Sequence, residues 1–205
     1  MGFIGGIIRL SFQECNKNEA PRRQLQLITH YPRCNLLSMT IPTRVSQIEW
    51  QQWVPTERAT LLFVLDNGRI LLINKKTGLG AGKINGPGGR IEPGETPMEG
   101  ALREVQEELC VTPTGVRWAG ELHFQFIDGY SIHAMVFTAP GFEGQLCETR
   151  EAAPIWTPVE QIPFEQMWAD DVLWLPLLLE GKGFQGFFIF DGDTMLDSKV
   201  TEKPL

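Results

Sequence analysis

The sequence is poor in the features that mark several classes of protein. Its 205 residues contain no apolar run near the ~20 residues of a membrane-spanning helix, so we expect no membrane partner. Four cysteines without a CxxC pair predict free thiols in a reducing, cytoplasmic setting. The three histidines lack the sequence spacing of metal ligands, and we expect ordinary strand or loop positions for them. These residues are Cys15, Cys34, Cys110, Cys147, His30, His123 and His133.

Basic residues are outnumbered by acidic ones, 18 against 25, which gives a formal net charge of −7. Residues 1–38 hold five basic and two acidic residues, a net charge of +3, whereas residues 39–205 carry −10. An acidic domain lacks the basic track that a long polyanion needs, so we expect no polymeric nucleic acid as partner. We interpret residues 1–38 as a poorly structured extension, upstream of a true start at Met39, and residues 39–205 as one domain. A transit peptide or a docking tail is the alternative for the extension.

Apolar patterning predicts an α+β domain with a mixed sheet. Residues 59–65 and 69–75 are apolar and rich in strand formers, and Asn67 and Gly68 between them suit the positive φ of a tight turn. Other runs predict strands at 116–127, 131–138 and 184–190 and a helix at 169–180 that contains Pro176.

A helix is predicted at 97–109. Thr96 and Glu99 form a capping box around Pro97, which suits the first helical position. Leu102, Val105 and Leu109 recur at helical spacing and are expected to form its buried stripe.

The same helix carries three glutamates on one side, Glu104, Glu107 and Glu108. Like charges three and four residues apart repel, at a cost of a few tenths of a kcal/mol each on an isolated helix. The helix dipole also disfavours anions in this half of the helix. Two interpretations remain open from these residues, a solvated acidic face and a site for a divalent cation.

The stretch GRIEPGETPMEGALREVQEELCV (89–111) resembles the signature of the Nudix hydrolases, G-x5-E-x7-R-E-U-x-E-E-x-G-U with U aliphatic. The matching positions are Gly89, Glu95, Arg103, Glu104, Val105, Glu107, Glu108 and Val111. Cys110 departs from the pattern, because the family has glycine there as the left-handed residue that ends the helix.

The resemblance implies an α/β/α sandwich that hydrolyses a nucleoside diphosphate linked to a further group. It implies Mg²⁺ as the cofactor, with Mn²⁺ as a substitute, held by Glu104, Glu107, Glu108 and the backbone carbonyl of Gly88. Arg103 is expected to orient a glutamate and Glu95 to stabilise the loop. Which glutamate acts as general base stays open.

Three further runs resemble the oxidised-purine nucleoside triphosphatases within this family, which include 8-oxo-dGTP diphosphatases. They are KKTGLGAGKINGPGG (75–89), QIPFEQMWADD (161–171) and WLPLLL (174–179). This resemblance implies that three polar residues contact the edge of the base, namely Asn85, Asp170 and Asp171. It implies that Trp168 stacks on the base and that Phe124 lines the pocket. It also implies that Thr60 and Lys75 lie near the nucleoside and that Glu151 adds a carboxylate beside the metal. Leu79 and Ile132 stand where that group has Phe and Met, which leaves base preference open.

Each of these assignments has a structural alternative. The acidic pair in MWADD also suits a helix N-terminus, and Trp168 also suits a hydrophobic core. For the whole chain we expect a monomeric enzyme that hydrolyses oxidised purine nucleoside triphosphates to the monophosphate and pyrophosphate. The alternatives are another Nudix activity, including one on RNA 5′ ends, and a non-catalytic nucleotide sensor.

Overall fold

The computed structural model describes residues 41–205, and the expectations for residues 1–38, Met39, Cys15, Cys34 and His30 lie outside this range. The elements are η1 (Val45–Gln47), β1 (Glu57–Asp66), β2 (Arg69–Lys75), β3 (Ile84–Asn85), α1 (Pro97–Leu109), β4 (Val111–Thr114), β5 (Arg117–Phe126), β6 (Ser131–Ala139), β7 (Gly141–Gly144), β8 (Ala152–Pro158), η2 (Val159–Gln161), η3 (Phe164–Gln166), α2 (Asp171–Leu179), β9 (Gly183–Asp191) and β10 (Thr194–Lys203).

Eight strands form one mixed sheet in the order β10-β9-β5-β6-β1-β2-β3, with β8 on β2. The β1–β6 and β5–β9 pairs are parallel, and the other pairs are antiparallel. Strands β4 and β7 form a separate two-stranded sheet. At the β1–β2 turn Asn67 and Gly68 have φ of 49° and 72°, as the sequence predicted.

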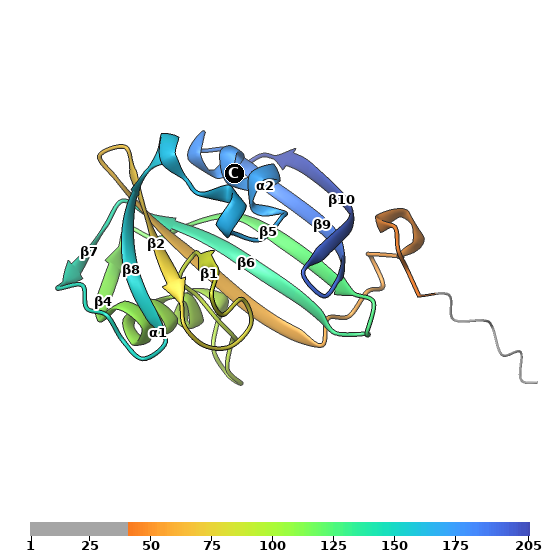
Figure 1. Cartoon of the computed structure of the whole chain (residues 1–205), viewed down its shortest axis with the longest axis horizontal. Helices are drawn as coiled ribbons and strands as arrows, with labels where there is room; N and C mark the ends of the chain where they lie inside the picture. The colour runs from red at the N-terminus through yellow and green to blue at the C-terminus, as the bar shows by residue number, and fades with distance from the viewer. Residues whose placement is uncertain (1–40) are drawn as a thin grey trace, which may run out of the picture. The chain divides into compact units, whose positions relative to one another are not determined.

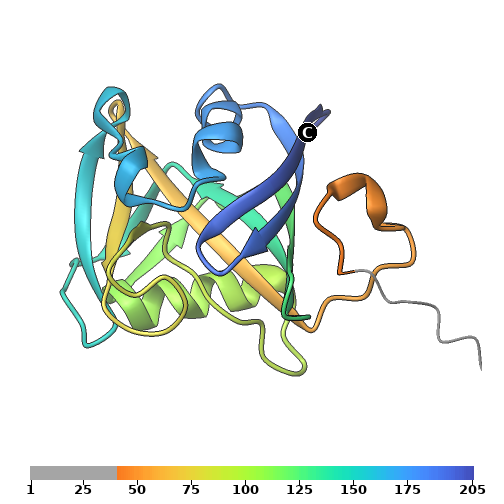
Figure 2. The same cartoon turned by 45° about the vertical axis from the view of Figure 1, so that its right-hand side comes forward.

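Helices α1 and α2 lie on opposite sides of the sheet (Figures 1 and 2). Successive residues of β1 therefore enter two different cores. Phe63 packs in the core that contains Trp174 of α2, whereas Leu62 and Val64 pack in the core that contains Val105 of α1. Burial on both faces explains why β1 and β2 are apolar without alternation. The expected α/β/α sandwich is confirmed.

Helix α1 begins and ends where the sequence predicted, and Thr96 and Glu99 form the capping box. The predicted buried stripe was wrong at Leu102, which is only half-buried, because Ala101 turns toward the core beside Val105 and Leu109. Cys110 ends the helix in the left-handed conformation, with φ of 65°. It therefore takes the backbone role of the family glycine.

Two cysteines correct the prediction of free thiols. Cys110 and Cys147 form a disulfide, with Cα atoms 5.7 Å apart. The Cys147 amide also donates to the carbonyl of Leu109, and the Thr149 hydroxyl donates to the carbonyl of Glu108. The loop after β7 is thus bound to the C-terminal end of α1.

The remaining differences concern polar or proline-containing strands. The sequence did not predict β3, β4, β7, β8 or β10, and α2 begins two residues later than expected, with Pro176 inside it. No helix within residues 41–205 is long and apolar enough to cross a membrane.

Candidate active site

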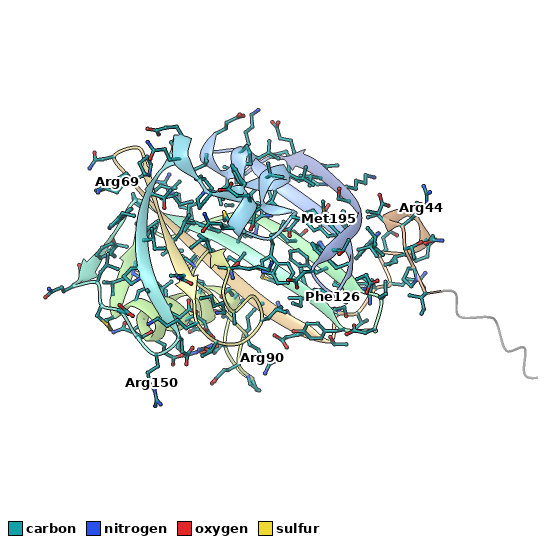
Figure 3. All side chains as sticks on the ribbon, in the orientation of Figure 1. Arg44, Arg69, Arg90, Phe126, Arg150 and Met195 are labelled. Atoms are coloured by element: carbon teal, nitrogen blue, oxygen red, sulfur yellow. A yellow bond between two sulfur atoms is a disulfide. The ribbon has the colours of Figure 1, made fainter. Side chains whose placement is uncertain are left out.

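A cavity of about 490 Å³ opens on the α2 side of the sheet. Its wall combines β1, β5, β6, the start of α2 and the glycine-rich loop between β2 and α1. The volume lies within the range of small-molecule sites, which is about 300–1,000 Å³. Figure 3 labels two residues of this wall, Phe126 from β5 and Arg90 from the loop before α1.

The glycine-rich loop brings its backbone against β1. The amide of Thr60 donates to the carbonyl of Gly89 at 2.8 Å. A Cβ at Gly88, whose φ is +151°, would overlap the carbonyl oxygen of Thr60, and a Cβ at Gly89 would overlap the carboxylate of Glu104. Only residues without a side chain allow the loop to approach both β1 and the glutamates of α1 this closely.

Glu108 is fully buried between two donors. Its Oε1 accepts from the Nζ of Lys75 at 2.9 Å, and its Oε2 accepts from the amide of Gly88 at 2.9 Å. Burial raises the pKa of Glu108, and the Lys75 ammonium opposes this rise. An acidic surface is therefore the wrong interpretation for this residue.

Arg103 links the other signature carboxylates. Its Nε and Nη2 donate to the two oxygens of Glu95 at 2.7 and 3.0 Å, and its Nη1 donates to Glu104 at 2.8 Å and Glu107 at 3.1 Å. The hydrogen bonds from Arg103 lower the pKa of Glu95, whereas burial raises the pKa of Glu104. Glu107 is the exposed member, with 57% of its side chain accessible. The guanidinium thus neutralises part of the repulsion among the glutamates.

Glu95 also bonds to its own loop. Its Oε2 accepts from the amide of Glu92 at 2.9 Å, while Arg103 donates to the carbonyl of Arg90. These contacts connect the loop to α1.

Two further predicted residues lie in the cavity wall. Glu151 is exposed there, and its carbonyl accepts from the amide of Lys76. Thr60 is 1% exposed, and its hydroxyl has no hydrogen-bond partner within residues 41–205. A buried hydroxyl without a partner is costly, so a ligand in the cavity that bonds to it would gain affinity.

Asp170 and Asp171 are both buried, and both line the cavity. Oδ2 of Asp170 accepts from the Trp174 indole at 2.9 Å, and Oδ2 of Asp171 accepts from the Trp168 amide at 3.1 Å. Asp170 lies at the N-cap of α2 but makes no side-chain cap hydrogen bond. Helix capping therefore does not account for Asp170, whereas Asp171 lies in the first turn of α2 and bonds to the backbone before it.

Burial governs the protonation of this pair. It raises the pKa of Asp170 from 3.8 to about 6 and raises the pKa of Asp171 well above its ordinary value, which the charge of Asp170 raises further. Burial thus favours the protonated form in this pair, and a protonated carboxyl can donate a hydrogen bond to a ligand in the cavity, whereas an ionised one only accepts.

Aromatic side chains form the apolar part of the wall. Trp168 packs edge-on against Phe190, and Phe124 stacks on Phe188 with centroids 5.2 Å apart. Asn85 and Trp168 lie together beside Gly80, where a Cβ would come within 2.7 Å of the Asn85 amide nitrogen and 2.9 Å of the Trp168 indole nitrogen. The cavity thus brings together an amide, two carboxyls and aromatic faces.

The sequence analysis assigned no role to four other wall residues, Glu57, Arg90, Phe126 and Tyr130. Arg90 pairs with Glu57 across the rim of the cavity. Phe126 could have been found from its spacing, since it lies two residues after Phe124 on the same strand face. The β1–β6 register that brings Tyr130 near Glu57 is not readable from spacing.

The donor set of α1 fits a hard divalent cation. Glu104, Glu107 and Glu108 supply carboxylate oxygens, and Gly88 lets the backbone come beside Glu108. In the structure these carboxylates are neutralised by Lys75 and Arg103 instead. Carboxylates and substrate phosphates are the ligands that Mg²⁺ prefers.

Comparisons with known proteins agree with this geometry. The family model described as NUDIX domain matches residues 48–178. The chain is 43% identical to "Oxidized purine nucleoside triphosphate hydrolase" of Danio rerio and 40% identical to the protein of that name from Mus musculus. Each match runs over 145 residues, which is 70% of this chain and 93% of the relative. The crystal structure of the mutator protein MutT from Bacillus halodurans is similar with a TM-score of 0.63 and 25% identity, over 70% of this chain and 97% of that chain.

Proposed function

Because the chain belongs to the Nudix hydrolase family, we propose that it hydrolyses oxidised purine nucleoside triphosphates, such as 8-oxo-dGTP, to the monophosphate and pyrophosphate. One observation carries this proposal. The cavity is lined by Lys75 and Gly88, which hold Glu108 of α1, and it is also lined by the buried pair Asp170 and Asp171. A site that cleaves phosphates needs carboxylates such as the glutamates of α1. A site that distinguishes one purine from another needs polar groups such as the pair Asp170 and Asp171.

The polar residues support recognition of a purine edge. Asn85 offers both a donor and an acceptor, and each carboxyl of the pair Asp170 and Asp171 can donate when protonated and accept when ionised. A site with matched polar groups rejects a wrong edge by leaving those groups unpaired, which discriminates more strongly than an apolar slot. We assign Trp168 and Phe124 to the faces of the base and Thr60 and Lys75 to the nucleoside and its phosphates, and all four residues line the cavity.

Nudix hydrolases in general use a divalent metal ion, and we propose Mg²⁺, with Mn²⁺ as a substitute, held by Glu104, Glu107, Glu108, the carbonyl of Gly88 and Glu151. When bound, the metal would polarise the phosphoryl oxygens and lower the pKa of a ligated water. The chain's own residues position that chemistry. Arg103 orients Glu104 and Glu107, while Lys75 and the Gly88 amide hold the buried carboxylate of Glu108.

The decisive experiment measures pyrophosphate release from a panel of nucleotides with and without Mg²⁺. We expect Mg²⁺-dependent release that is fastest for oxidised purine triphosphates. Faster cleavage of a triphosphorylated or capped RNA 5′ end would support a different Nudix activity. Binding of nucleotides without release would support a non-catalytic sensor, and either outcome would refute the proposal.

A further inference from the structure

Three metal-ligand side chains meet on the reverse face of the strands that form the cavity floor. Leu122 and Phe124 of β5 face the cavity, so Glu121 and His123 point to the other side of the sheet. The β5–β6 register places His133 directly opposite His123. The group thus lies on β5 and β6, on the face of the sheet opposite the cavity, and within residues 41–205 it shares no hydrogen bond with the glutamates of α1.

We propose that Glu121, His123 and His133 form a second metal site, which binds Zn²⁺. Their ligand atoms all lie within 4.8 Å of one another, and Nε2 of His133 lies 2.9 Å from Oε2 of Glu121. Two imidazoles and one carboxylate are a known ligand set for zinc, with a water at the fourth position. Glu121 and His123 lie two residues apart on β5, and His133 lies on the adjacent strand β6. A sheet holds this arrangement of three ligands rigidly.

Hydrogen bonds around the group support this assignment. The carbonyl of Gly186 can only accept, so the Nδ1 of His123, 3.1 Å away, carries the proton and its Nε2 stays free as a ligand. The side-chain amide of Gln185 donates to Oε1 of Glu121 at 2.8 Å, so a metal would bind Oε2 in place of its present contact with His133. Metal-bound histidines and carboxylates are oriented by partners of this kind.

Coordination requires one change in ring orientation. The rings of His123 and His133 are stacked, with centroids 4.4 Å apart and 19° between their planes. Nitrogens of nearly parallel rings do not point to a common position, so one ring must turn about its Cβ–Cγ bond. His133 is the ring able to turn, because Glu121 holds it by a single hydrogen bond, whereas His123 is bound to Gly186 and stacked on Phe187.

The group has access to solvent and differs in chemistry from the glutamates of α1. His123 and Gln185 line a cavity of about 710 Å³ beneath the segment 45–51. This cavity gives access to His123, and the side chains of His133 and Glu121 are themselves 19% and 31% exposed. Imidazole nitrogens favour zinc over Mg²⁺, which prefers oxygen ligands, so the two sites select different ions.

The test is isothermal titration of the full-length protein with ZnCl₂ in the presence of millimolar Mg²⁺. We expect one tight zinc site in the parent. His133→Asn should weaken it at least tenfold, and Gln185→Leu about tenfold, because it removes the partner that orients Glu121. Glu107→Gln, which changes the glutamates of α1, should leave this site intact. Zinc should raise the melting temperature of the parent but not that of His133→Asn.

Co²⁺ is the second probe, because four-coordinate Co²⁺ absorbs visible light far more strongly than six-coordinate Co²⁺. We expect the strong absorption in the parent and in Glu107→Gln, and its loss in His133→Asn. If His133→Asn does not fold, Glu121→Gln takes its place. Absence of tight zinc binding would overturn the proposal. Unchanged zinc binding in His133→Asn or Glu121→Gln would also overturn the proposal. Loss of zinc binding in Glu107→Gln, or a thiolate-to-cobalt absorption band, would overturn it as well. Pyrophosphate release should be the same in parent and His133→Asn, so this test is independent of the proposed hydrolysis.

Discussion

Replacing Asp170 with asparagine should make the protein more stable and less active. Folding raises the pKa of this carboxyl from 3.8 to about 6, because the group is buried. The folded state therefore holds the proton more tightly than the unfolded state does. This advantage is complete below pH 3.8 and is lost as the pH rises through about 6. A difference of about two pKa units corresponds to ~3 kcal/mol at neutral pH and above.

Asparagine keeps the shape of Asp170 and removes the charge. Its side-chain oxygen can still accept from the Trp174 indole, which now bonds to Oδ2 of Asp170 at 2.9 Å. We therefore expect the free energy of unfolding at pH 8 to rise by about 3 kcal/mol, measured by urea denaturation. The fall in stability between pH 4 and pH 6 should become smaller. Asp66→Asn makes the same change on an exposed carboxyl and should alter stability by less than about 0.5 kcal/mol.

Activity should change in the opposite direction. A fixed amide at Asp170 cannot exchange a proton with Asp171, so the edge presented to the base is altered. We expect kcat/KM for 8-oxo-dGTP to fall at least tenfold, or ~1.4 kcal/mol, with a much smaller effect on dCTP. A destabilised variant at pH 8, or an unchanged pH dependence of stability, would refute the reasoning about burial. An equal loss for all nucleotides would refute the role in base recognition.

The remaining predictions concern other parts of the domain. Glu108→Gln should reduce pyrophosphate release at least a hundredfold, or ~2.7 kcal/mol, and should leave the circular dichroism spectrum unchanged. A rate within about threefold of the parent would show that this residue does not belong to the site. Gly88→Ala should lower the free energy of unfolding by about 3 kcal/mol or more, because a Cβ at this position has no room. Gly94 also has a positive φ but has open space around it, so Gly94→Ala should lower the free energy of unfolding by about 1 kcal/mol. Cys147→Ser should cost about 2–4 kcal/mol, and a reducing agent should lower the stability of the parent by the same amount while leaving the variant unaffected. A chain that begins at Met39 should match the full chain in melting temperature and activity, and a large loss in either would show that residues 1–38 contribute.

The sequence predicted best where structure depends on local signals. The start of α1 follows from the Thr96 capping box, its end from the apolar spacing that stops at Leu109, and the β1–β2 turn from Asn67 and Gly68. Strand β10 was missed because it mixes charged and apolar residues at the edge of the sheet. Strand β8 was missed because it contains Pro154 and Pro158, which argue against a strand when they are read without the sheet.

Contacts between distant segments were less accessible from the sequence. The Cys110–Cys147 disulfide joins residues 37 positions apart with no recognisable motif. His123 and His133 do lie on strands, as predicted, but spacing along the chain did not reveal that they face each other. Their equal distance from the turn of the β5–β6 hairpin is the signal that would have found this pair. The residues of the candidate site could be proposed one by one only through resemblance, because the burial of Asp170 and Asp171 is not encoded in a short motif.

The parallel pairing of β5 with β9 also determines when the sheet can be completed during synthesis of the chain. The glutamates of α1 leave the ribosome early, but Phe188 and Phe190, which pack under the cavity, arrive with β9 near the end of synthesis. Until then β5 is an open edge with unpaired backbone groups, which favours aggregation. Long-range parallel pairing also forms slowly. Protein production should therefore be most sensitive to truncation or mutation in β9 and β10, far from the residues that carry the chemistry.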